Sequence, residues 1–273
     1  MLESRKREIR IKADSFREKC KVGRYGIIDL FKECERAGYK LLRYPLGENA
    51  DLGFMVKKDN DIVIFTNTCS RLSREIFTLA HEIGHVILHL EDEKPFIDDN
   101  VTINGRSTDE KEQEANYFAA CLLMPANDVN RFIDLEIRDF HEKGLSAIDI
   151  VRIMSEFNVS FDMALNRLES LNVINQSRKL CLDNERIEKR VGNLLRSVGG
   201  NAKLNLPSNE IYIPYEYIDY AIYNYNHNAI PKETLEKVLA CYHLEIEDIR
   251  DKLIQPSDDD DDDLDELIGD LDD

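Results

Sequence analysis

The chain lacks several features that would place it in a membrane or outside the cell. No run of 18 uninterrupted apolar residues occurs among its 273 residues, so we expect no membrane-spanning helix. Residues 1–7 lack the apolar stretch of a secretory signal peptide. The six cysteines lie far apart without C-x-x-C spacing, which does not indicate a disulfide framework. Together these absences predict a reduced, cytoplasmic protein.

Positive charge is also scarce. The chain has 36 basic against 54 acidic residues and a net charge of −18. Residues 258–273 contain eleven acids and no base, so only −7 belongs to the rest. An acidic surface repels phosphate over a Debye length of about 8–10 Å, so nucleic acid is not expected as the main partner. The tail has too few apolar residues to fold alone, although its leucines could contact a partner.

Apolar periodicity predicts a mixture of helices and short strands in the first half of the chain. Residues 25–37 show helical spacing and end at Gly38, a typical residue after a helix. A second helix is expected to start at Ser70 or Ser73 and to end near His89. Three strand-like runs lie between these helices, the last two forming a hairpin: 39–44, 52–57 and 62–67.

The second helix carries the motif His81-Glu82-Ile83-Gly84-His85. Residues four apart lie about 40° apart around a helix, so His81 and His85 can bind one metal ion. Glu82 is offset by one residue, where a general base beside the metal is expected. Gly84 leaves space for a substrate or for a neighbouring backbone. The motif predicts a hydrolytic zinc site.

A catalytic zinc usually has three protein ligands, and the next predicted helix offers Glu110, Glu112 and Glu114. Glu112 shares its face with Ala115 and Ala119, small residues that let two helices pack closely. The helical wheel therefore favours Glu112 and leaves Glu114 as the alternative. Glu110 points the opposite way and is typical of an acid in the first turn.

Three further side chains are possible hydrogen-bond donors to the reacting carbonyl. They are Tyr117, His89 and His141, and the sequence does not choose among them. His89 lies one turn beyond His85, so we expect it to contact a ligand or the helix end.

The segment F-T-L-A-H-E-I-G-H-V-I-L-H at 77–89, followed by E-x-E-A-N-Y-F-A-A-C-L-L-M-P at 112–125, resembles the ImmA/IrrE family of metallo-endopeptidases. The resemblance covers roughly 25–175. In that family the third ligand is the glutamate four residues before the Asn of the A-N-x-F-A-A segment, which is Glu112 here. The resemblance implies zinc on His81, His85 and Glu112, with Glu82 as the catalytic carboxylate.

The resemblance implies an α+β fold, and the chain as a whole is expected to divide into four segments. Residues 1–140 are expected to form a zincin-like core, in which a small antiparallel or mixed sheet packs on the two motif helices. A helix-turn-helix-like segment (141–177) and a mostly helical region (178–256) follow, and the disordered acidic tail is 257–273.

The implied function is an intracellular zinc endopeptidase that cuts one regulatory protein, such as a transcriptional repressor. Two alternatives use the same sequence differently. A zinc-binding sensor or adaptor would keep the metal without turnover. A DNA-binding regulator would use the helix-turn-helix outline at 145–174, but its second helix offers Asp162 and Glu169 beside Arg167, which disfavours DNA.

Overall fold

A computed structural model describes residues 1–50, 52–58, 61–90, 96–98, 109–138 and 140–254 of the chain. It contains two compact units, Met1–Tyr212 and the residues from Ile213 onward. The finer division at 140 and 177 stays a prediction. The predicted acidic tail at 257–273 lies outside the described residues.

The described residues form one mixed sheet of four strands in the order β1-β3-β2-β4. β1 runs parallel to β3, while β2 is antiparallel to both of its neighbours, β3 and β4. The predicted hairpin is therefore confirmed in its two strands. The strands are β1 (Lys40–Tyr44), β2 (Gly53–Lys58), β3 (Asp61–Asn67) and β4 (Phe96–Asp98).

Both hairpin strands are already paired where they approach the motif helix. β3 is interior, because β1 and β2 occupy its two sides. β4 pairs with β2 from Gly53 to Met55. The outer side of β1 is closed at one position, where Arg43 and Tyr212 exchange backbone hydrogen bonds of 2.8 and 2.9 Å. β3 therefore offers no edge to an added strand.

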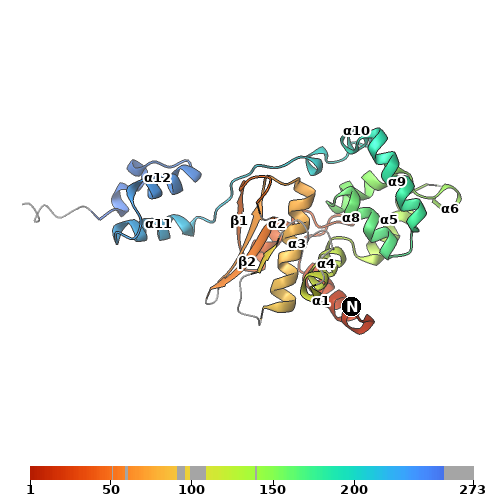
Figure 1. The fold of residues 1–273 in the computed structure, drawn as a ribbon, viewed down its shortest axis with the longest axis horizontal. Helices are drawn as coiled ribbons and strands as arrows, with labels where there is room; N and C mark the ends of the chain where they lie inside the picture. The colour runs from red at the N-terminus through yellow and green to blue at the C-terminus, as the bar shows by residue number, and fades with distance from the viewer. Residues whose placement is uncertain (51, 59–60, 91–95, 99–108, 139, 255–273) are drawn as a thin grey trace, which may run out of the picture. The chain divides into compact units, whose positions relative to one another are not determined.

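Helix α3 (Leu72–His89) carries the motif and lies along the sheet, with α4 (Glu110–Leu123) and α1 (Glu3–Arg17) beyond it (Figure 1). It contacts β2 and β3 on one side and α4 on the other, and α1 packs on α4. This layered arrangement confirms the predicted α+β class.

A buried ion pair fixes the start of α3 to the sheet. The carboxylate of Glu75 accepts hydrogen bonds from Arg43 of β1 at 2.7 and 3.1 Å and from Thr66 of β3 at 3.0 Å. All three side chains are buried. A buried charge pair of this kind is costly to break from one side, so it holds α3 at one position on the sheet.

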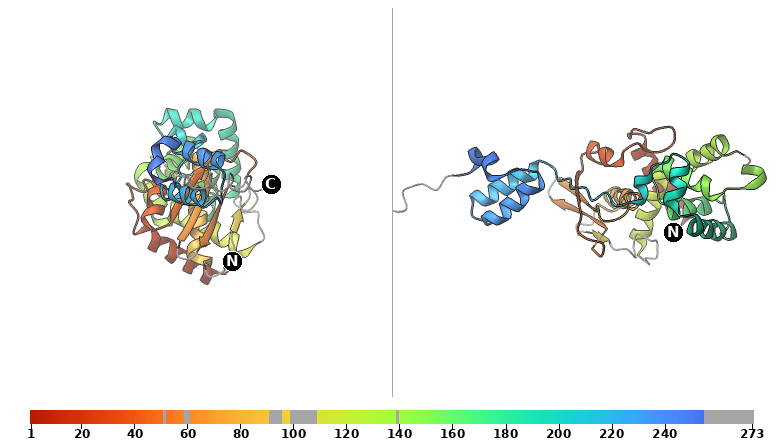
Figure 2. Two further views of the ribbon diagram at one scale, coloured as in Figure 1. Left: turned by 90° about the vertical axis from the view of Figure 1, so that its left-hand side faces the viewer. Right: turned by 90° about the horizontal axis from the view of Figure 1, so that it is seen from above.

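The rest of the first unit is helical, and the second unit is a small helical cluster in which α11 and α12 pack side by side (Figure 2). Ile218, Leu235 and Leu239 form the buried centre of that cluster. The remaining elements are α2 (Leu30–Arg36), α5 (Ala126–Glu136), α6 (Phe140–Lys143), α7 (Ala147–Phe157), α8 (Phe161–Ser170), α9 (Gln176–Lys189), α10 (Val191–Ser197), η2 (Ala202–Asn205), α11 (Glu216–Asn226), α12 (Lys232–Cys241) and η3 (Ile246–Lys252).

The helix-turn-helix outline is present as α7 and α8, joined through Asn158 in the left-handed conformation. Arg167, the only base of α8, is buried and donates to the carbonyl oxygen of Met124 at 2.8 Å. The exposed positions of α8 carry Asp162, Asn166 and Ser170. Because no basic side chain of α8 is available to phosphate, the structure gives DNA binding through this segment no support.

Two local predictions were wrong. The helix expected over 25–37 spans only Leu30–Arg36, because Asp29 caps it by accepting from the Lys32 amide. The residues before it form a tight turn in which the Gly23 amide donates to the Gly26 carbonyl. Neither Ser70 nor Ser73 caps α3; the Leu72 amide instead donates to the carbonyl of Leu206.

Candidate metal centre

The motif face of α3 is buried between the sheet and α4. Apolar residues such as Leu79, Ala80 and Ile83 are fully buried, and the exposed fractions of His81 and His85 are 0% and 1%. Histidines four residues apart share one face, so their rings stand one above the other, with centroids 4.7 Å apart. The local sequence thus places two imidazoles inside the protein.

Close packing of α3 on α4 brings Glu112 to the pair of histidines. A Cβ on Gly84 would lie 3.3 Å from the Cα of Ala115 and 3.1 Å from the ring of Phe118. Gly84 therefore makes room for a neighbouring backbone, one of the two roles expected from the sequence. Glu112 lies one turn before Ala115 on the same buried face of α4, directed at the histidine pair.

The three donors converge on one point. The Nε2 atoms of His81 and His85 lie 3.0 Å apart, and oxygens of Glu112 lie 3.3 Å and 3.2 Å from them. Within the described part of the chain, this is the one group of three potential metal-binding side chains whose donor atoms lie within 4.8 Å of one another. A tetrahedral zinc with bonds of about 2.0–2.1 Å needs donors about 3.3 Å apart. The spacing and chemistry of the set therefore fit a divalent metal ion.

The charge on Glu112 suits the same role. Burial alone would raise the pKa of its carboxyl group, but the adjacent rings of His81 and His85 outweigh burial and hold the pKa well below the ordinary value. The residue therefore faces the two rings as a carboxylate, the form that binds a metal.

The Nδ1 atom of each histidine ring, which faces away from the cluster, is also in contact with a polar side chain. His81 Nδ1 lies 3.1 Å from Oδ1 of Asn116 on α4, so it donates to that oxygen and leaves Nε2 for the cluster. His85 Nδ1 lies 3.2 Å from Nδ1 of His89. His89 is therefore in contact with a candidate ligand, as the sequence suggested. Burial lowers the pKa of His89, against the effect of its partner Glu114.

The other acids of α4 lie elsewhere. Glu110 is exposed at the first turn. Glu114 binds His89 Nε2 at 3.0 Å and Arg5 of α1 through two hydrogen bonds, and the Arg5 guanidinium lowers the pKa of Glu114 to about 2. The alternative of Glu114 as the third member of the cluster is thus not supported.

Glu82 is fully buried on the sheet side of α3. Strand β2 approaches the helix here, because a Cβ on Gly53 would lie 3.4 Å from Oε1 of Glu82 and only 2.4 Å from the side chain of Thr78. The glycine thus allows the strand to rest directly beside the catalytic carboxylate expected from the sequence.

Gly53→Ala is expected to destabilise the protein by about 1–3 kcal/mol, because the added methyl group overlaps Thr78 and forces β2 away from α3. Urea unfolding of both proteins measures the difference. Gly192→Ala is the matched control, since its nearest neighbours would be 3.9 Å away, and it should cause no loss. Equal stability of Gly53→Ala and wild type would contradict the close contact.

A cleft of about 760 Å³ lies between α3, α4 and α8. Arg74 and Phe77 line it from the same face of α3 as His81. Asn116, which holds His81, and Tyr117 line it from α4. Tyr117, one of the three expected donors, accepts a hydrogen bond from Arg10 at 3.0 Å.

His141, another expected donor, is exposed on α6 beside Phe140, and α6 lies apart from α3 (Figure 1). The structure therefore does not bring it to the cluster. Among the described residues, no helix is both long and apolar enough to cross a bilayer.

Comparison with known families agrees with this geometry. Residues 34–169 match the model of the Peptidase_M78 family, described as the IrrE N-terminal-like domain. These residues form an M78 metallopeptidase domain. A search of curated proteins returned no match.

The M78 domain includes the sheet, α3, α4 and α8, whereas α1 precedes it. The sequence had indicated this family from its two motif segments, and that assignment is confirmed. Asn116 and Gly53 were not predicted from the sequence as parts of the site. Asn116 could have been found, because it lies one helical turn after Glu112 and therefore on the same face. No local pattern marks Gly53.

Proposed function

We propose that the chain is a zinc-dependent endopeptidase that cleaves one regulatory protein, with a transcriptional repressor as the expected target. The observation that carries the proposal is the convergence of His81, His85 and Glu112 in an M78 domain, with the buried Glu82 next to His81 in the sequence. Two imidazoles and one carboxylate are a donor set typical of catalytic zinc, which supports zinc as the metal.

In this proposal His81, His85 and Glu112 hold the metal, and Glu82 is the catalytic residue. A divalent metal at this position would polarise the peptide carbonyl and acidify water. Glu82 accepts a proton from the attacking water and returns it to the leaving amine. Asn116 keeps His81 in the tautomer whose Nε2 carries no hydrogen and is directed at the cluster.

The cleft between α3, α4 and α8, lined by Asn116 that contacts His81, is the proposed binding site for the substrate chain. Phe77 and Arg74 line it, and Arg74 lies about 10 Å before His81 along α3 at 1.5 Å per helical residue. An extended peptide covers that distance in roughly three residues. All six cysteines have free thiols, which supports action in a reducing compartment such as the cytoplasm.

The proposal is tested by expressing wild type and Glu82→Gln in the host and comparing new protein N-termini by mass spectrometry. We expect one regulator to lose intact mass and gain an internal N-terminus only with wild type. Glu110→Gln, an exposed change on α4, is the matched control and should behave as wild type.

The same strains separate the zinc-sensor alternative from the protease. If Glu82→Gln keeps the cellular function and His85→Ala abolishes it, the metal acts without turnover and the protease proposal is wrong. Salt-sensitive duplex binding by the purified chain would instead favour the DNA-binding alternative.

A further inference from the structure

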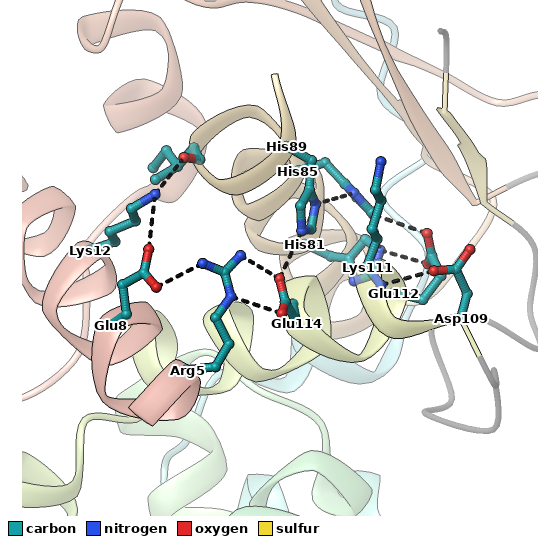
Figure 3. Close-up of polar contacts among 11 residues, drawn as sticks. Arg5, Glu8, Lys12, His81, His85, His89, Asp109, Lys111, Glu112 and Glu114 are labelled. Carbon is teal, nitrogen blue, oxygen red and sulfur yellow. Dashed lines mark hydrogen bonds and ion pairs between the residues drawn. The ribbon is translucent and has the colours of Figure 1, made fainter. Parts of the chain in front are cut away.

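A series of hydrogen-bonded side chains, called the relay below, connects the cluster to a helix outside the M78 domain. It begins at His85, continues through His89 and Glu114, and ends at Arg5 of α1 (Figure 3). Arg5 precedes the matched residues 34–169, so the family domain alone does not contain all residues of the relay. None of the last three residues is a member of the metal-binding group.

The donor and the acceptor of each hydrogen bond can be assigned by starting from the carboxylate of Glu114. A carboxylate only accepts, so His89 Nε2 must donate across the 3.0 Å contact to Glu114. The other nitrogen of a neutral His89 ring is then an acceptor. It lies 3.2 Å from His85 Nδ1, which therefore carries the hydrogen. The Nε2 atom of His85 is left with its lone pair directed at His81 and Glu112.

Arg5 fixes the position of the Glu114 carboxylate in this relay. Its Nε and Nη2 atoms donate to the two oxygens of Glu114 at 2.8 and 2.6 Å. Its remaining Nη1 atom lies 2.8 Å from Glu8, one turn further along α1. A bidentate arginine–carboxylate pair sets orientation as well as distance, so it determines which way the carboxylate faces His89.

The two histidines are thus held in different ways. His81 is held by Asn116, within the M78 domain, whereas His85 depends on a pair between α4 and α1. Groups that hydrogen-bond a metal-binding histidine fix its tautomer and ring angle, and their loss typically weakens metal binding about 10–100-fold.

We propose that Arg5 and Glu114 are positioning residues that hold His85, through His89, in the orientation and tautomer that bind the metal. The N-terminal helix is therefore part of the metal site's support. The inference rests on the proposed role of His85 as a ligand.

The test uses the purified full chain and measures zinc affinity by competition with a chelating dye. Arg5→Ala and Glu114→Gln are expected to weaken zinc binding about 10–100-fold. Arg5→Lys keeps the charge but loses the bidentate geometry, so it should recover only part of the affinity. The visible spectrum of the Co²⁺-loaded variants should also change, because the ligand geometry at the metal changes.

Arg10→Ala is the matched control. It removes a different hydrogen bond between α1 and α4, from Arg10 to Tyr117, and leaves the relay intact. Its zinc affinity and Co²⁺ spectrum should equal those of wild type. Circular dichroism of the metal-free proteins verifies that every variant is folded, and Glu114→Gln provides the test if Arg5→Ala is not.

Two results would overturn the inference. One is unchanged zinc affinity and Co²⁺ spectrum in Arg5→Ala and Glu114→Gln. The other is an equal loss of affinity in Arg10→Ala, which would attribute the effect to general packing of α1. Failure of the wild-type chain to bind zinc at all is distinguishable from both, and it would contradict the proposed function as well.

Discussion

Replacement of Glu82 by glutamine is expected to reduce peptide-bond cleavage by about 100–10,000-fold while the zinc content stays that of wild type. The amide has the size of the carboxylate and should fit the same buried position beside Gly53. It cannot accept the proton of the attacking water, so the step assigned to Glu82 is lost. The measurement combines the cleavage rate of the target protein with metal analysis of the same sample.

Glu110→Gln provides the control for this result, because it makes the same chemical change at an exposed position of α4. It should cleave at the wild-type rate. Retention of wild-type activity by Glu82→Gln would remove Glu82 from the mechanism, and loss of zinc in that variant would mean that Glu82 supports the metal instead.

Glu112→Ala is expected to lower zinc affinity by more than the 10–100-fold typical of groups that only contact a ligand, because it removes one of three donors. The remaining histidines, with Nε2 atoms 3.0 Å apart, would bind the metal alone. Titration with zinc against a chelator of known affinity gives the change. The protein should remain folded, since Ala115, Phe118 and Leu122 still bury α4 against its neighbours.

The three glutamates of α4 form a graded series for the same titration. Loss of affinity should be largest for Glu112→Ala, smaller for Glu114→Gln and absent for Glu110→Ala. The order reflects their contacts: Glu112 faces both histidines, Glu114 binds His89, and Glu110 is exposed. A larger loss for Glu114→Gln than for Glu112→Ala would reverse the assignment of the third ligand.

The parts of the site that could be predicted from the sequence are those set by helical periodicity. His81 and His85 are four residues apart, and Glu112 shares a face with Ala115 and Ala119, so the angle around each helix was enough to predict their direction. The hairpin of β2 and β3 could also be predicted locally, from two strand-like apolar runs close together in the sequence.

Contacts between distant segments could not be predicted in this way. Glu114 remained an alternative to Glu112 because its partner Arg5, 109 residues away in the sequence, could not be predicted. The first turn of α3 likewise uses a carbonyl of Leu206 rather than a nearby serine. In the 25–37 region, helical spacing was outweighed by the turn at Gly23 and the cap at Asp29.

The backbone pairing of Arg43 with Tyr212 has a consequence for biosynthesis. At about 5–20 residues per second, a ribosome makes Tyr212 roughly 10–30 s after Arg43. Until then β1 has an outer edge that is unpaired at this position, and open strand edges promote association between chains. This pairing therefore forms only near the end of the first unit's synthesis. A nascent chain released before Tyr212 would carry the full motif on a sheet whose strand β1 is still unpaired on its outer side at Arg43.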